Sequence, residues 1–197
     1  GTACVASPLH TTAVVETGRR ETVLTMTGAD TFDPVELEEK LRECTRKDRF
    51  FGMDLGEISE RFLGNKIYAN SILLGAAFQR GALPVSLDNL KWAMTVNIRP
   101  NELDPNLKAF EMGRKAALQP EAFEKPSTRL SLQEFIETRS GYLALGWGKR
   151  AADIYRGLVD RVTAWSIDEQ DRVRFALGVY DTYQWGGKTV AAGYADL

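Results

Sequence analysis

Two short segments with the composition of strands, separated by one helix, constrain the fold of this chain more than any other feature. Residues 12–17 and 49–54 are rich in apolar, β-branched or aromatic side chains, and residues 22–27 could form a further extended piece. The intervening helix begins at Asp33, a good capping residue, with Pro34 at the first helical position. A strand–helix–strand order favours parallel pairing. Because the later sequence is helical, we predict an α/β fold: a partial doubly wound sheet followed by a mostly helical region.

The helix between the strands carries signals at its start and along one face. Glu36 stands where a capping box places an acidic residue, and Phe32 and Leu37 have the spacing of a hydrophobic staple. Leu37, Leu41 and Cys44 form one apolar stripe at helical spacing. We therefore interpret Cys44 as a small core residue and not as a nucleophile.

Several helices follow the second strand, and the sequence indicates their ends. Residues 69–78 contain no charged side chain, which predicts a helix buried on most sides. Gly75 weakens that helix, and the close approach of another backbone explains it better than a ligand does. Gly81 ends the helix and Ser86 opens the next one. Residues 104–105, an aspartate followed by a proline, predict the start of a further helix after a turn.

One arginine lies on an apolar helix face. Arg114 shares this face with Leu107, Phe110 and Leu118. Because an unpaired buried charge is costly, the guanidinium must reach water or find an anion. A snorkelling or ion-paired arginine is the simpler interpretation, and an interface or substrate-carboxylate contact is the alternative.

The last third of the chain is predicted to be helical and separate from the rest. Residues 119–130 contain prolines and form a linker, and Ser131 with Glu134 makes a capping box that opens the next helix. Glycines interrupt the apolar pattern and predict a kink or break. They are Gly141, Gly146, Gly148, Gly186 and Gly187.

Composition excludes several classes of protein. With 25 basic and 27 acidic residues among 197, the chain is not a strongly basic nucleic-acid binder. No apolar run is long enough to span a bilayer, and we expect a cytoplasmic protein without a signal peptide. Two cysteines, Cys4 and Cys44, cannot supply the four ligands of an iron–sulfur cluster or a structural zinc site. His10, the only histidine, is better explained as a surface residue than as a catalytic base.

Two stretches resemble a known family. Residues 68–86 combine Asn70, a Leu-Leu-Gly helix and a Gly-x-x-Pro-x-Ser turn, and residues 106–114 read Asn-x-x-Ala-Phe-x-x-Gly-Arg. Together they resemble the gamma domain of 2-oxoacid:ferredoxin oxidoreductases, most nearly the large fused indolepyruvate ferredoxin oxidoreductase. Residues 139–162 are similar to the long helix that follows this domain in the fused enzyme. Residues 190–194 are similar to the last helix of the family, although they have diverged from it.

The resemblance implies a Rossmann-like sheet of which only part is encoded here. A complete gamma domain begins with a strand, a Gly-x-Gly-Gly-Gln-Gly turn and further β-α units, which these residues lack. Residues 1–118 therefore correspond to the C-terminal half of the domain, residues 119–130 to the linker and residues 131–197 to a helical extension. The chain is either a fragment of a fused polypeptide or a separate subunit. We expect its sheet edge to be covered by the other half of the domain.

The resemblance also implies a function without an active site of its own. The family reaction is oxidative decarboxylation of a 2-oxoacid, with thiamine pyrophosphate and iron–sulfur clusters held on partner domains and ferredoxin as acceptor. We assign no catalytic, cofactor-binding or metal residue here. Asn70, Asn106, Phe110 and Arg114 are candidates for the interface or substrate side. Partners are the other domains or subunits, and ferredoxin indirectly. The alternative is a non-catalytic helical assembly module; a free-standing dinucleotide-binding enzyme is disfavoured by the missing glycine-rich turn.

Overall fold

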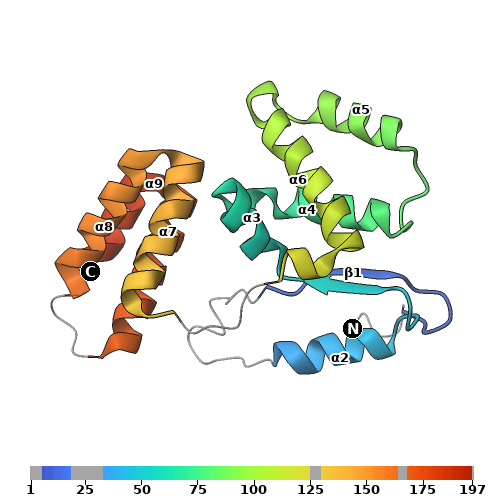
Figure 1. The fold of residues 1–197 in the computed structure, drawn as a ribbon, viewed down its shortest axis with the longest axis horizontal. Coiled ribbons are helices and arrows are strands. Elements are labelled where there is room, and N and C mark those ends of the chain that lie inside the picture. The colour runs from blue at the N-terminus through green and yellow to red at the C-terminus, as the bar shows by residue number, and fades with distance from the viewer. Residues whose placement is uncertain (1–5, 19–32, 125–129, 164–167, 197) are drawn as a thin grey trace. The chain divides into compact units, whose positions relative to one another are not determined.

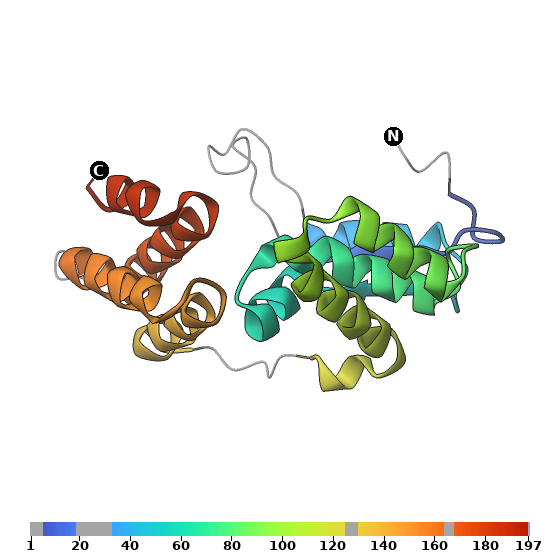
Figure 2. The same cartoon turned by 90° about the horizontal axis from the view of Figure 1, so that it is seen from above.

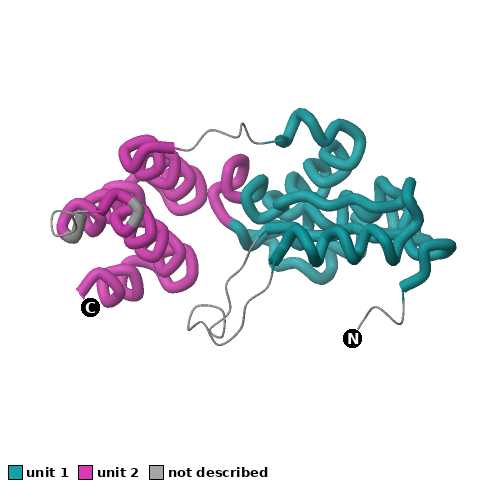
Figure 3. The backbone as a smooth tube through the Cα atoms, turned by 90° about the horizontal axis from the view of Figure 1, so that it is seen from below, with its two compact units in different colours: residues 1–59, 66–124 teal, residues 60–65, 125–197 magenta. Residues whose placement is uncertain are grey.

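The chain folds into two compact units (Figure 3). A computed structural model describes residues 6–18, 33–124, 130–163 and 168–196. Unit 1 comprises residues 1–59 and 66–124, and unit 2 comprises residues 60–65 and 125–197. The boundary near residue 124 falls inside the segment for which we predict a linker. The assignment of the two parts to half of a gamma domain and an extension stays a prediction.

Unit 1 contains a two-stranded parallel sheet. β1 (Ala13–Glu16) pairs with β2 (Phe50–Met53), with Ala13 opposite Phe50 and Glu16 opposite Met53. The two strands and their parallel pairing confirm the sequence-based prediction. The sheet has no other strand among the residues that the structure describes, and residues 22–27 lie outside them.

The helix between the strands begins as predicted. In α2 (Pro34–Glu43), the Asp33 carboxylate accepts a hydrogen bond from the backbone N–H of Val35 at 2.8 Å. The expected capping box does not form. Instead, Glu36 accepts a hydrogen bond from Lys40 Nζ, one turn further along the helix, at 2.5 Å.

The apolar stripe of α2 is not part of a packed core, and the prediction that Cys44 is a small core residue is wrong. Leu37 is 48% exposed and Leu41 is 40% exposed, and α2 has no buried residue. Cys44, which caps the helix, is half-buried and not a core residue. The stripe borders a groove, described below, so nothing in the described chain covers it fully. Phe32 and its predicted staple lie outside the described residues.

The remaining helices of unit 1 follow β2. They are α3 (Leu55–Leu63), whose last turn belongs to unit 2, the short 3₁₀ helix η2 (Lys66–Tyr68), α4 (Ala69–Gln79), α5 (Leu87–Asn97), α6 (Pro100–Leu118) and the 3₁₀ helix η3 (Pro120–Ala122). α4 and α6 lie on one side of the strands and α2 on the other (Figures 1 and 2). Helices therefore flank both sides of the sheet, as in a doubly wound fold.

Two glycines allow α4 and α6 to touch backbone to backbone. A Cβ added at Gly75 would lie 1.9 Å from the carbonyl oxygen of Phe110, and one added at Gly113 would lie 1.9 Å from the carbonyl oxygen of Ile72. Phe110 and Ile72 are themselves fully buried. The expectation that Gly75 marks a close backbone approach is confirmed.

The start of α6 differs from the sequence-based prediction. The helix begins at Pro100, with Arg99 as its cap, and Pro105 lies inside it. Residues 99–102 therefore form its first turn and not a separate turn before residues 104–105. A proline inside a helix leaves the carbonyl four residues earlier without a partner. Here that carbonyl belongs to Asn101, an exposed residue, so water can solvate it.

Besides the end of α3, the described part of unit 2 contains α7 (Leu132–Trp147), α8 (Lys149–Thr163) and α9 (Glu169–Ala195). The predicted capping box opens α7, because Ser131 and Glu134 each accept a hydrogen bond from the other's backbone N–H. Gly148, at φ +87°, separates α7 from α8, and Gly187, at φ +67°, breaks α9. The break predicted at the glycines of this part of the chain is confirmed, since both glycines adopt a conformation that other residues rarely reach. The segment 139–162, which is similar to one long helix of the family, is therefore divided at Gly148.

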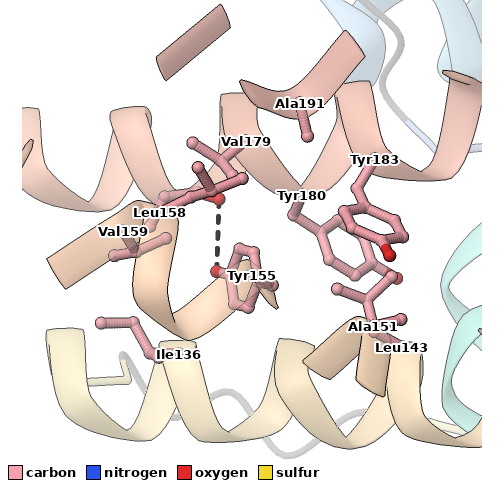
Figure 4. Packing of buried hydrophobic residues seen from close by; sticks show 11 residues of the cluster. Ile136, Leu143, Ala151, Tyr155, Leu158, Val159, Val179, Tyr180, Tyr183 and Ala191 are labelled. Atoms are coloured by element: carbon pink, nitrogen blue, oxygen red, sulfur yellow. Dashed lines mark hydrogen bonds between the residues drawn. The ribbon is translucent and has the colours of Figure 1, made fainter. Parts of the chain in front are cut away.

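Side chains from all three helices of unit 2 form its core (Figure 4). The rings of Tyr155 and Tyr180 meet edge to face with their centroids 6.1 Å apart. The Tyr155 hydroxyl donates a hydrogen bond to the carbonyl oxygen of Ala176 at 3.2 Å. Burial raises the pKa of both phenols far above their ordinary value, so both remain neutral across the physiological range.

A buried ion pair holds the end of α3 in unit 2. Arg139 Nη1 lies 2.6 Å from Glu60 Oε2, and the two side chains are 14% and 1% exposed. The guanidinium also lies over the rings of Phe135, Tyr142 and Tyr180 at 4.9 to 5.6 Å. Burial opposes the charged form of Arg139, but the Glu60 carboxylate outweighs it and raises the pKa of the guanidinium.

Candidate functional site

A groove of about 450 Å³ opens beside the carboxyl end of β1, between α2 and α4. This end of a parallel sheet is where α/β proteins bind their ligands, and the volume lies in the range of small-molecule sites. Its apolar lining is Val15, Pro34, Leu37, Leu41, Ala69 and Leu73. Its polar lining is Glu16, Thr17, Glu38 and Asn70.

Two carboxylates occupy the amino end of α3, next to this groove. Glu16 accepts hydrogen bonds from the backbone N–H groups of Gly18 at 2.7 Å and Gly56 at 3.0 Å. Asp54 accepts one from the N–H of Glu57 at 2.8 Å. A helix amino end is otherwise a ready site for an anion. These N–H groups are already used, and no lysine or arginine among the described residues lines the groove, so its described lining offers no positive charge to an anionic ligand.

The four candidate residues from the sequence do not converge on one site. Asn70 is exposed at the start of α4 and lines the groove. Asn106, Phe110 and Arg114 lie on α6. Phe110 is fully buried, with its ring centroid 6.0 Å from that of Phe78, so its side chain packs inside unit 1. The interface and substrate-side roles of all four residues stay predictions.

Polar contacts join the amino-terminal halves of α4 and α6. The Tyr68 hydroxyl donates to Glu102 Oε2 at 3.1 Å, and Ser71 Oγ donates to Asn106 Oδ1 at 2.5 Å. Burial, and then the Glu102 carboxylate, raise the pKa of Tyr68. Sequence reasoning missed Ser71 and Glu102. The only signal in the sequence is spacing, because Ser71 lies about one helical turn from Tyr68, and Glu102 about one turn from Asn106. This spacing indicates a polar cluster only once the two helices are known to face each other.

Arg114 finds its partners within unit 1. Its Nε donates to Gln79 Oε1 at 3.1 Å, and its Nη1 lies 2.9 Å from Glu111 Oε2. Lys91 of α5 also reaches Glu111, at 2.7 Å. Burial alone would raise the pKa of Glu111, but Lys91 and Arg114 outweigh it and lower that pKa below its ordinary value of 4.5. The contacts therefore fit the ion-paired interpretation of Arg114.

Replacing Arg114 by alanine is expected to lower the free energy of unfolding by about 1–2 kcal/mol at pH 7, because charged hydrogen bonds are lost. The side chain is 27% exposed, so the loss is smaller than for a fully buried pair. Since the pKa of Glu111 is lowered in the folded state, the difference between the two proteins should shrink as the pH falls below 4.5. Urea denaturation at pH 7 and near the acid limit of folding measures both effects.

Arg174 provides the matched control for this variant. It pairs with Asp171 at 3.3 Å but is 77% exposed, so Arg174→Ala should change stability by less than about 0.5 kcal/mol. Equal effects of the two substitutions, or an Arg114→Ala difference that grows in acid, would contradict the assignment.

Neither His10 nor Cys44 belongs to a group of potential metal ligands among the described residues. His10 is exposed and Cys44 is half-buried, whereas Cys4 lies outside the described residues. In the described parts of the chain, no three histidine, cysteine, aspartate or glutamate side chains are grouped to hold a metal ion. Nor does any described helix combine the length and apolarity needed to cross a membrane.

A comparison with protein families decides where the chain belongs. The model of the pyruvate ferredoxin/flavodoxin oxidoreductase family matches residues 9–116, more than half of the chain. The chain belongs to this family. The match includes both strands, the groove and the contacts between α4 and α6, whereas α7, α8 and α9 lie beyond it. It confirms the resemblance that residues 68–86 and 106–114 carry.

Two curated proteins are also similar to the chain. Over 90 residues it is 30% identical to the indolepyruvate oxidoreductase subunit IorB of Pyrococcus horikoshii and 29% identical to that of Thermococcus kodakarensis. The aligned stretch is 46% of this chain and 44% of each relative, so the match spans less than half the length of these curated relatives. No solved structure matches the chain.

Proposed function

We propose that this chain is an accessory, gamma-type component of an indolepyruvate oxidoreductase. The family match over residues 9–116 carries the proposal. The similarity to two proteins named as subunits of that enzyme supports it. Other domains or subunits of the oxidoreductase are then the partners of this chain. A cytoplasmic location belongs to the same proposal, since thiolate-held clusters on the partners suit a reducing compartment.

In this proposal the assembly decarboxylates an arylpyruvate-type 2-oxoacid oxidatively, with ferredoxin as electron acceptor. Thiamine pyrophosphate and iron–sulfur clusters supply that chemistry, and other parts of the assembly hold them. Neither the cysteine content of the sequence nor the described residues beside the groove fit these groups. A cluster takes four thiolates, whereas the sequence contains only Cys4 and Cys44. A diphosphate needs N–H groups or cations, and the N–H groups beside the groove are bonded to Glu16 and Asp54.

The purified chain is therefore expected to contain neither iron nor thiamine pyrophosphate. Metal analysis of the protein by mass spectrometry, and fluorimetric assay of extracted thiamine pyrophosphate, check this directly. The complete oxidoreductase, prepared in the same way, is the positive control. Stoichiometric iron or thiamine pyrophosphate in the 197-residue chain would contradict the absence of a cofactor site.

Co-purification tests the proposed partnership. A tagged copy of the chain, expressed together with the genes that neighbour its own, should purify in fixed stoichiometry with a thiamine-binding partner that carries ferredoxin-type cysteines. Native mass spectrometry gives the composition of the complex. A fixed complex with partners that lack these features would instead favour the non-catalytic assembly module.

A further inference from the structure

Four basic side chains gather at the end of unit 1 where both strands begin. Arg46, Lys47 and Arg49 belong to the connection between α2 and β2, and Arg80 caps the end of α4. The ends of α2 and α4 lie beside the starts of the strands (Figure 1). These four residues form what we term the basic cluster. None of them lines the groove beside β1, so the cluster is a separate feature of the molecule.

Hydrogen bonds to the backbone hold two arginines of the cluster in place. Arg49 Nη1 donates to the carbonyl oxygen of Arg80 at 3.3 Å, and Arg80 Nη2 donates to the carbonyl oxygen of Asp48 at 3.0 Å. The first bond sets a cation at the carboxyl end of α4, where the helix dipole favours positive charge. A carbonyl oxygen fixes the position of a guanidinium but does not neutralise it.

One carboxylate serves the whole cluster. Asp48 Oδ2 lies 3.5 Å from Arg46 Nη2 and 3.4 Å from Arg49 Nε. Within the described chain, no other carboxylate pairs with any of the four cations. The cluster therefore has an excess of positive charge, although the formal net charge of the chain is −2. Arg46 and Arg49 are 43% and 41% exposed, so a partner can reach both guanidinium groups.

The form of the cluster favours a protein as its partner. Small ligands bind in concave, mostly apolar sites, whereas these cations lie on a connecting loop and at a helix end. The acidic net charge of the chain, and the Asp48 carboxylate within the cluster, disfavour a long polyanion such as nucleic acid. Arginines form bidentate pairs with carboxylates and are enriched at protein interfaces. An acidic segment of a protein matches these properties.

We propose that the basic cluster is a docking surface for an acidic segment of a protein partner. Aspartate or glutamate side chains of this segment pair with Arg46, Arg49 and Arg80, and Lys47 adds a further cation. Complementary charge of this kind speeds association and selects among partners. The partner is another subunit or domain of the oxidoreductase, and in this respect the inference rests on the proposed function.

An acidic peptide tests this inference on the whole chain. The probe is a short glutamate-rich peptide labelled with fluorescein, and fluorescence anisotropy measures its binding at low ionic strength. Binding should weaken steadily as salt is added, because exposed charges are screened. The same peptide with glutamine in place of glutamate is the uncharged control and should not bind. Equal binding of the two peptides would contradict recognition by charge.

Charge reversal locates the binding surface. Arg46→Glu/Arg49→Glu is expected to weaken binding of the glutamate peptide by at least about tenfold, because it replaces two cations of the cluster by carboxylates. Arg161→Glu/Arg174→Glu is the matched control. It changes the net charge equally, but these arginines belong to unit 2 and are 56% and 77% exposed. Equal losses in the two proteins would show that binding follows net charge alone, and would overturn the proposal.

A milder variant keeps the test valid if the double substitution disturbs the fold. Lys47 is exposed, and Lys47→Glu leaves the backbone contacts of Arg49 and Arg80 intact. It should weaken binding of the glutamate peptide by about threefold or more, with an unchanged circular dichroism spectrum. Unchanged binding would show that the peptide does not lie on the basic cluster.

Other ligands give different results, each of which overturns the proposal. Displacement of the peptide by an equal concentration of inorganic phosphate would identify a site for small anions. Tighter binding of a short DNA duplex than of the peptide, lost in Arg46→Glu/Arg49→Glu, would identify a nucleic-acid surface. Failure of the peptide to bind at low ionic strength would show that the cluster does not attract acidic segments.

Cross-linking identifies the partner in the co-purified complex. A carbodiimide joins a lysine to a carboxylate that it contacts, and mass spectrometry should find Lys47 joined to an aspartate or glutamate of a partner chain. Links of Lys47 to this chain alone, or none, would contradict docking at the cluster. The peptide experiment needs no partner, so its failure is distinguishable from a failure of the chain to enter an oxidoreductase complex.

Discussion

Replacing Arg139 by methionine is expected to lower the free energy of unfolding of unit 2 by about 3–5 kcal/mol, because it leaves a buried carboxylate without its cation. Glu60 is 1% exposed, and Arg139 lies 2.6 Å from it. The substitution also removes the cation that lies over three aromatic rings. Urea denaturation followed by tryptophan fluorescence reports on this unit, since Trp147 packs against Tyr183 within it.

The double variant Glu60→Leu/Arg139→Met separates a lost charge pair from lost packing. Exchanging a whole buried ion pair for apolar side chains is often neutral, so this protein should regain most of the stability that Arg139→Met loses. Glu137→Gln is a surface control, because Glu137 pairs with Arg156 and is 52% exposed. If Arg139→Met lowers the free energy of unfolding by less than about 1 kcal/mol, the ion pair with Glu60 behaves like an exposed one, which would contradict its burial.

Replacing Gly75 by alanine is expected to destabilise unit 1 by about 1–3 kcal/mol, the usual cost of overpacking. The added Cβ would lie 1.9 Å from the carbonyl oxygen of Phe110, so α4 and α6 must move apart. This cost should exceed the gain of about 1 kcal/mol that alanine brings to a helix interior. Gly113→Ala should have a similar effect, because its Cβ meets the carbonyl oxygen of Ile72 at the same distance.

Gly141 is the matched control for these glycines. It also lies inside a helix, but nothing lies within 4 Å of an added Cβ. Gly141→Ala should therefore stabilise the chain by up to about 1 kcal/mol, through helix propensity alone. If alanine at Gly75 is also stabilising, as measured by urea denaturation, then α4 and α6 do not touch as described.

Local features of this fold could be predicted from the sequence, because the residues that form each of them lie within about one helical turn of one another. The caps at Asp33, Ser86 and Ser131 form between neighbours in the chain. The same holds for the end of α4 at Gly81, whose φ is +68°. The parallel pairing of β1 and β2 followed from the order of the elements, since a strand–helix–strand unit has few other solutions.

Side-chain pairs between residues far apart in the sequence could not be predicted from it. Glu60 and Arg139 are 79 positions apart, and no local pattern distinguishes them from surface charges. The start of α6 was misplaced because an aspartate–proline pair has the same local sequence signature one turn into a helix as at its start. For the site, Asn70 was selected from the sequence and lines the groove. The groove itself depends on where three elements meet, so Cys44, at the end of the stripe of Leu37 and Leu41, was mistaken for a core residue.

The most direct test of the central claim is turnover by the reconstituted assembly. Reduction of ferredoxin that depends on indolepyruvate is measured with this chain alone, with the thiamine-binding and cluster-binding partners alone, and with all of them together. An accessory component without an active site predicts no turnover by the chain alone and a large increase when it joins its partners. Turnover by the isolated chain, or full activity of the partners without it, would contradict the account.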